Sequence, residues 1–202
     1  MLRLRDRKII ETLQLFRCMS RDQITALYFN HVKNSSTATN YVLKRLRRDQ
    51  YIDVNTERKP YVYFPNPSTL KKDSQKINHY LKIIDFYIGL CQYEVPTVFE
   101  VEQRCGYAFL QPDIFMVWKG MAFFVEIQNS RYTKMQMQEK VDRYTKYKQS
   151  ENWIQQSISY HIKQFPYVWI VSRLPYEIMS PDIQIIQTEN VEEFMQFQLE
   201  CS

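Results

Sequence analysis

Residues 111–128 have the sequence "QPDIFMVWKGMAFFVEIQ", in which two apolar runs are joined by Lys119 and Gly120. A lysine-glycine pair between two β-prone runs predicts a hairpin with a two-residue turn, because glycine supplies the positive φ that this turn needs. Opposed residues then have numbers that sum to 239, which places Asp113 across from Glu126. Opposed Cβ atoms lie about 5 Å apart, so the two carboxylates repel each other unless a cation or a shared proton lies between them.

Glu126 is the more demanding of the two acids, because both of its neighbours in "MAFFVEIQ" are apolar. A buried carboxylate there costs several kcal/mol unless it is paired. Period-two geometry adds Gln128 to the same face. Three interpretations remain open: a Mg²⁺ or Mn²⁺ site, a buried salt bridge, or plain exposure to solvent. The candidate salt-bridge partners are Arg131, Lys134 and Lys140.

The segments around this hairpin predict an α/β (α+β) domain. A helix is expected from about residue 74 to residue 93, before three strands in series, a helix, two further strands and a short helix. Three consecutive strands followed by a crossover helix imply a mixed sheet with helices on its faces. The expected strands and later helices are 96–103, 110–118, 121–128, 135–159 (helix), 167–172, 182–188 and 191–199 (helix).

Composition indicates an ordinary globular protein of one or two domains, with 45% hydrophobic and 24% charged residues among 202. The four cysteines and three histidines are scattered, which favours neither a zinc site nor a disulfide framework. No apolar run is long enough to span a membrane, and the opening "MLRLRDRKII" is charged at once. We therefore expect a cytoplasmic protein without a membrane partner.

Charge divides the chain unequally. Residues 1–72 contain 15 Lys and Arg against 6 Asp and Glu, a net charge of +9, whereas residues 73–202 carry −4. A segment of about 70 residues with this charge has the electrostatic footprint of a protein that binds a phosphate backbone. The alternative is a basic surface that only serves solubility.

The basic segment predicts three helices and a two-stranded ribbon. Ser20 is placed to cap the second helix, and Ser35 or Ser36 to cap a third helix that runs to about Asp49. Leu43 and Leu46 fall on the buried face of that third helix, and Tyr41 is also expected in the core. The ribbon strands are 51–54 and 61–64. Residues expected to contact DNA are Ser36, Thr37 and Asn40 at base edges, and Lys44, Arg45, Arg47, Arg48, Arg58 and Lys59 at phosphates.

Residues 6–65, with "VLKRLRRDQYI" and the basic hairpin, resemble the winged helix-turn-helix. The resemblance implies a DNA-binding domain over residues 1–66, although winged helices also serve as docking or dimerisation modules. The punctuated stretch "PNPSTLKKDS" follows, so we place a second domain at 74–202.

The second domain resembles the PD-(D/E)XK nuclease-like core, with "PD" at 112–113 and "EIQ" at 126–128. In that superfamily two acids hold a metal and a lysine activates the attacking water, so the resemblance implies Mg²⁺ or Mn²⁺ on Asp113 and Glu126. Gln128 stands where the lysine is expected and cannot supply its charge. Catalysis would then require Lys134 or Lys140 to reach the same place; Asp113, Glu126, Gln128 and Lys140 are the candidate catalytic set.

Taken together, residues 6–150 resemble the replication-relaxation family of bacterial plasmids and mobile elements. The most specific part is the PD, an apolar strand, the glutamate and a helix with "EKVDRYTKY". The resemblance implies binding of double-stranded DNA in replication, relaxation or their regulation, with a nuclease-like domain of unproven activity. Partners would include a second copy of the chain and replication or conjugation proteins.

Two other functions remain open. One is a Mg²⁺- or Mn²⁺-dependent DNA nuclease or nickase. The other is a protein-interaction adaptor, which the 15 tyrosines and 12 phenylalanines favour.

Overall fold

The computed structural model describes residues 2–105, 110–130 and 132–200. The chain forms two compact units, Met1–Ile88 and Gly89–Ser202, which we call the N-terminal and C-terminal units. The division falls inside a helix and later than the expected boundary at 65–74. In the expected linker, the side chain of Asn55 donates a hydrogen bond to the Lys72 carbonyl at 2.8 Å.

The N-terminal unit has the three helices and the hairpin that its sequence predicts. Strand β3 lies between β2 and a two-residue strand β1, both antiparallel to it, so the ribbon has one strand more than expected. Helix α1 packs on β3, and α2 packs on α3. The elements are α1 (Leu4–Phe16), β1 (Met19–Ser20), α2 (Arg21–Tyr28), α3 (Ser35–Arg48), β2 (Ile52–Asn55) and β3 (Val62–Pro65). Helix α4 (Ile77–Cys91) follows and contains the division between the two units.

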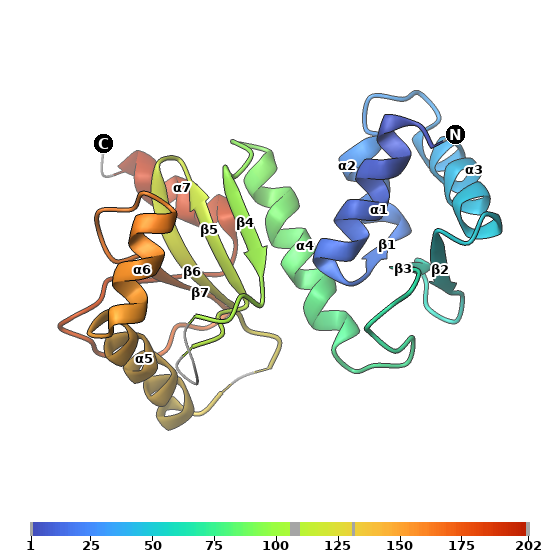
Figure 1. Cartoon of the computed structure of the whole chain (residues 1–202). Helices are drawn as coiled ribbons and strands as arrows, with labels where there is room; N and C mark the ends of the chain where they lie inside the picture. Colours follow the sequence, from blue (N-terminus) through green and yellow to red (C-terminus); the bar gives the residue numbers. More distant parts are fainter. Residues whose placement is uncertain (1, 106–109, 131, 201–202) are drawn as a thin grey trace. The chain divides into compact units, whose positions relative to one another are not determined.

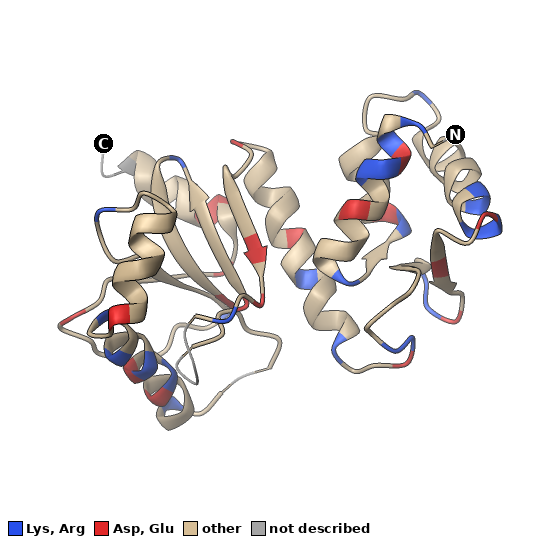
Figure 2. Ribbon diagram, in the orientation of Figure 1, with Lys and Arg blue, Asp and Glu red and all other residues tan. Residues whose placement is uncertain are grey.

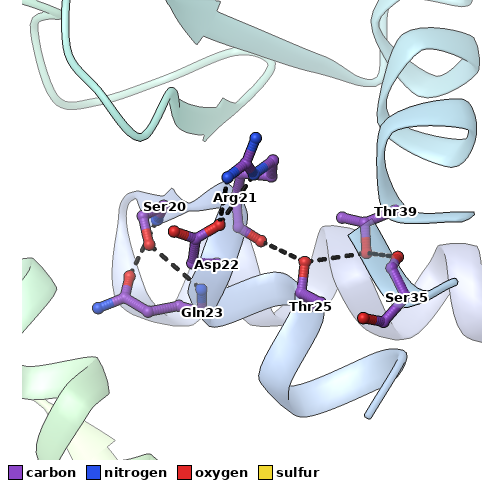
Figure 3. A network of polar contacts seen from close by, with 7 residues as sticks. All are labelled: Ser20, Arg21, Asp22, Gln23, Thr25, Ser35 and Thr39. Atoms are coloured by element: carbon purple, nitrogen blue, oxygen red, sulfur yellow. Dashed lines mark hydrogen bonds and ion pairs between the residues drawn. The ribbon is translucent and has the colours of Figure 1, made fainter. Parts of the chain in front are cut away.

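Local side-chain bonds fix the start of α2 and its contact with α3 (Figure 3). Ser20 caps α2 as predicted, since its hydroxyl accepts from the Gln23 amide at 3.2 Å and its own amide donates to the Gln23 side chain at 2.9 Å. The buried Thr39 hydroxyl donates to the Ser35 carbonyl and lies 3.0 Å from the Thr25 hydroxyl on α2. The two helices of the expected helix-turn-helix are thus joined by a polar contact.

The cap predicted for α3 was wrong by one residue. Asn34 is the N-cap, and Ser35 is already the first helical residue. The Asn34 side chain makes no capping hydrogen bond, so the preference of serine for this position did not decide where the helix begins.

The C-terminal unit contains the expected mixed sheet, with strand order β4-β5-β6-β7-β8. Strands β4, β5 and β6 are antiparallel neighbours, and β6, β7 and β8 run parallel. Helices α5 and α6 cover one face, and α7 covers the other (Figure 1). The elements are β4 (Val98–Val101), β5 (Ile114–Trp118), β6 (Met121–Ile127), α5 (Lys134–Lys148), α6 (Glu151–Ser159), β7 (Tyr167–Val171), β8 (Ile185–Thr188) and α7 (Val191–Glu200).

The single helix expected over 135–159 is two helices. Ser150 has extended backbone, with φ −95° and ψ 152°, and stands as the N-cap of α6. Its hydroxyl donates to the Tyr147 carbonyl at 2.7 Å, a bond that competes with continuation of the helix. Apolar spacing continues through the break, which is why periodicity alone predicts one helix.

The hairpin register is the predicted one. Lys119 and Gly120 have φ of 50° and 75°, as a two-residue turn of this hand requires. Trp118 pairs with Met121, and the ladder continues to Ile114 opposite Val125. The next position along each strand belongs to Asp113 and Glu126, so the turn brings the two acids together at the end of the ladder.

Aromatic side chains fill both faces of the sheet. Phe124 contacts Tyr144 of α5 on one face, with ring centroids 5.4 Å apart. On the other face Trp169 lies 4.3 Å from Phe194 of α7. The α+β class is therefore confirmed. Among the described residues, no helix has the length and apolar character needed to cross a bilayer.

A buried ion pair holds α3 against α1. The Asp6 carboxylate is fully buried and accepts from Arg45 through both oxygens at 2.9 Å, and from the Arg3 amide at 2.9 Å. Arg45 keeps only a quarter of its side chain exposed. This pair orients the exposed face of α3 relative to the start of α1.

Asp6→Ala should therefore destabilise the N-terminal unit by about 3–5 kcal/mol, because it leaves a mostly buried guanidinium without its partner. Urea unfolding followed by circular dichroism measures the loss. The matched control is Asp49→Asn, which removes the exposed ion pair with Arg48 and should leave the unfolding midpoint unchanged. Equal effects of the two substitutions would contradict a special role for Asp6.

Candidate nucleic-acid interface and acidic site

Helix α3 presents one polar stripe to solvent. Its buried positions are Thr39, Val42, Leu43 and Leu46. The exposed positions repeat at three- and four-residue intervals, as one face of a helix does. They are Ser36, Thr37, Asn40, Tyr41, Lys44, Arg47 and Arg48.

A groove of about 610 Å³ separates α3 from the β2–β3 hairpin, and we call it the wing-side groove. The start of α2 and the strands of the hairpin complete its walls. Four cations and one acid line it, so its potential is positive. The charged lining residues are Arg21, Asp22, Lys44, Arg47 and Lys59.

Four predicted contact residues line this groove, namely Asn40, Lys44 and Arg47 of α3 and Lys59 of the hairpin loop. Figure 2 shows the basic residues along α3 and α1. The arrangement brings polar, cationic and backbone surfaces together in the way that phosphate and base contacts need.

Three predicted contacts already have partners within the molecule, and one of them, Arg48, pairs with the neighbouring Asp49 at 2.8 Å. Arg45 is bound to the buried Asp6, so its charge is already neutralised. Arg58 donates to the Asn78 side chain of α4 at 2.6 Å, whereas its neighbour Lys59 lines the groove. Sequence spacing predicts which face a cation occupies but not which acceptor it meets.

The structure adds one cation to the predicted contacts of the groove and corrects one core assignment. Arg21 lines the groove from the first position of α2, and its guanidinium bonds Asp22 at 2.8 Å. The signal for Arg21 in the sequence is its place directly after the Ser20 cap. The prediction that Tyr41 lies in the core is wrong, because 73% of its surface is exposed. It stands on the polar stripe, almost opposite Leu43 and Leu46 on the helix.

A second hollow, of about 460 Å³, lies on the opposite flank of α3 beside the start of α1. We call it the α1-side groove. Arg3, Arg5 and Arg45 supply its charge, and no acidic residue lines it. Thr37 and Tyr41 of α3 form part of its wall.

The acidic pair of the C-terminal unit lies under helix α5. Glu126 is 1% exposed, and its Oε1 accepts from the Tyr144 hydroxyl at 2.6 Å. Its Oε2 faces the Lys140 ammonium at 2.5 Å as an ion pair, without a well-directed hydrogen bond. Lys140 and Tyr144 are four residues apart on α5, so one face of the helix presents both groups to one carboxylate.

Asp113 and Gln128 complete the predicted set. Asp113 Oδ2 accepts from the Ile127 amide at 2.8 Å, one residue beyond Glu126 on β6. The Gln128 amide donates to the Val171 carbonyl at 2.9 Å, which continues the sheet. Asp113, Glu126 and Lys140 are thus close enough to influence one another's charge.

The charges of this cluster perturb each other. Burial raises the pKa of Glu126 to about 7, against the pull of Lys140 and with a further push from Asp113. Burial alone would lower the pKa of Lys140, but attraction to Glu126 and Asp113 outweighs it and raises that pKa. The pKa of Tyr144 is raised well above its ordinary value by burial and by the charge of Glu126.

Of the three basic residues proposed as salt-bridge partners of Glu126, one makes that salt bridge. Lys140 reaches Glu126, whereas Lys134 pairs with the exposed Glu177 at 3.1 Å. Arg131 lies outside the described residues.

A divalent metal does not fit this arrangement. Both oxygens of Glu126 already have partners, and one of these partners is an ammonium that occupies the position of a cation. No group of three His, Cys, Asp or Glu residues converges anywhere in the described part of the chain. Mg²⁺ and Mn²⁺ sites need several oxygen ligands, and here a lysine meets the charge requirement instead.

Glu126 should make stability depend on pH. Its folded pKa is raised above the unfolded value, so folding takes up a proton, and the stability that this supplies is lost as pH rises from about 4.5 through about 7. Thermal unfolding midpoints of the native chain and of Glu126→Gln, measured from pH 5 to pH 8, should shift in favour of the variant as pH rises. A difference between the two that stays constant with pH would contradict this account.

Comparison with known proteins identifies a family. The family model described as replication-relaxation matches residues 10–158, about three quarters of the chain. The searches with this chain found no match among the curated proteins or the solved structures. The match begins within α1 and ends within α6. It therefore includes helix α3, which lines both grooves, and the acidic cluster. The chain belongs to the replication-relaxation family.

Proposed function

We propose that this chain is a DNA-binding protein that acts in the replication or relaxation of a plasmid, phage or other mobile element, or in its regulation. The N-terminal unit is the DNA-binding module, a winged helix-turn-helix with α3 as the recognition helix and β2–β3 as the wing. The observation that carries the proposal is the wing-side groove, in which α3, the start of α2 and the hairpin bring four cations to one surface. The family description supports the process.

Each part of the groove suits a different contact. Asn40 is exposed on α3 and carries an amide that can both donate to and accept from base edges. Lys44, Arg47 and Lys59 are suited to phosphates, which supply most of the affinity of such proteins and make it depend on salt. Ser36 and Thr37 continue the exposed stripe toward the start of α3.

The C-terminal unit acts without cleaving DNA in this proposal. A general nuclease mechanism needs a metal or an activated water near the acids, and the Glu126 carboxylate is closed off by Tyr144 and Lys140. The cluster then stabilises the sheet under α5. The unit would serve as a platform for a second copy of the chain or for replication or conjugation proteins.

The double variant Lys44→Ala/Arg47→Ala should weaken binding to a random-sequence 25-base-pair duplex and lower the slope of log affinity against log salt by about 2, since each lost phosphate contact removes about 0.9. Fluorescence anisotropy between 50 and 200 mM salt measures both quantities. The matched control is Lys71→Ala/Lys76→Ala, which removes two exposed cations that line neither groove. Unchanged binding by the groove variant would favour the adaptor function instead.

A metal-dependent nuclease is the second candidate, because the predicted acids and a lysine do converge; a metal would first have to displace Lys140 from Glu126. We expect supercoiled plasmid incubated with the native chain and Mg²⁺ or Mn²⁺ to remain supercoiled on agarose gels. Nicking by the native chain that Glu126→Gln abolishes, while the folded state persists by circular dichroism, would overturn the non-catalytic proposal. Lys140→Met then tests whether the lysine takes part.

A further inference from the structure

Helix α3 is a ridge between two basic hollows. Successive residues of an α-helix turn by about 100°, which places Thr37, Tyr41, Lys44 and Arg48 along one crest, opposite the buried side. The wing-side groove is lined by Asn40 and Arg47 on one shoulder of this crest. The α1-side groove is lined by Ala38 and Arg45 on the other shoulder.

Both hollows carry positive charge from elements other than α3. Arg21 and Lys59 contribute to the wing-side groove from α2 and the hairpin loop. Arg3 and Arg5 contribute to the α1-side groove from the start of α1. The Arg3 side chain is exposed, and the Arg5 guanidinium lies 4.3 Å from the centre of the Phe29 ring, which positions it at the wall of the groove.

The Asp6 pair gives Arg45 a different role from these four cations. Because Arg45 is bound to Asp6, it supports the wall of the α1-side groove. Its remaining cations are the exposed Arg3 and the partly exposed Arg5. The ion pair thus fixes the distance between the crest of α3 and the second set of cations.

We propose that α3 enters the major groove of B-form duplex DNA as a ridge and that the two hollows take the two phosphate backbones that border that groove, one from Arg21 and Lys59 and the other from Arg3 and Arg5. This inference rests on the proposed function and adds a second binding flank that the recognition helix and wing do not supply. The major groove is about 12 Å wide and admits one helix, so cations on both shoulders of that helix face opposite strands.

The exposed Tyr41 acquires a role in this arrangement. It stands on the crest, where an apolar ring with a hydroxyl meets base edges and thymine methyl groups. A base contact contributes affinity without releasing counterions. A phosphate contact contributes affinity and also releases counterions, so it makes binding depend on salt. The contact that Tyr41 makes on the crest is therefore separable by experiment from the phosphate contacts of the cations.

Salt titrations on the full chain test the two flanks. With a random-sequence 25-base-pair duplex, Arg3→Ala/Arg5→Ala and Arg21→Ala/Lys59→Ala should each lower the salt slope by about 2, and the combination of all four by about 4. Arg3→Ala alone should lower it by about 1 and guards against misfolding, since its side chain is exposed. Tyr41→Ala should weaken binding at every salt concentration with an unchanged slope. Lys71→Ala/Lys76→Ala again serves as the control.

The outcomes separate this inference from the proposed function. If the native chain binds duplex and the Arg21/Lys59 variant loses slope while Arg3→Ala and Arg3→Ala/Arg5→Ala keep the native slope, the second flank is wrong and the DNA-binding proposal stands. If the native chain binds a single strand of the same length as tightly as the duplex, the two-strand grip is also wrong, because one strand offers one backbone. If the native chain binds no DNA at all, both proposals fall together.

Discussion

The position of helix α3 depends on one carboxylate that has no access to water. Asp6 lies one turn into α1 and is satisfied by the Arg3 amide and by both-oxygen contacts to Arg45 of α3. A buried ion pair of this kind adds little net stability over an apolar contact of the same shape, yet it tolerates few alternative geometries. Its main effect is therefore specificity of arrangement, because α3 cannot rotate about its axis without separating Arg45 from Asp6.

The acidic cluster of the C-terminal unit also contains a buried carboxylate that is satisfied by partners within the protein. Glu126 is held by an ammonium and a hydroxyl from one helix, and Asp113 is held by a backbone amide of the neighbouring strand. The two acids that the sequence pattern singles out thus lie together, and Lys140 and Tyr144 meet the charge of Glu126 from within the protein. The positive charge beside Glu126 comes from Lys140 of α5, whereas the glutamine two residues after the glutamate carries no charge.

Much of this was accessible from the sequence where local physics decides. The Lys119-Gly120 turn leaves one register for the hairpin, and that register brings Asp113 beside Glu126. The buried face of α3 follows from Leu43 and Leu46 in the same way. The fates of Arg45 and Arg58 were not accessible, because each depends on an acceptor far away in the chain. The exposure of Tyr41 and the break at Ser150 show the same limit, since periodicity does not report which faces are covered or where a hydroxyl competes for a carbonyl.

The aromatic packing of the sheet also gives the two units different optical signatures. All three tryptophans, Trp118, Trp153 and Trp169, belong to the C-terminal unit, and the first and last are fully buried against Phe194 or its neighbours. Indole emission excited near the red edge of protein absorbance therefore reports on that unit alone, while far-ultraviolet ellipticity averages over both. Comparing the two signals during denaturation distinguishes unfolding of the N-terminal unit from unfolding of the C-terminal unit without any label being attached.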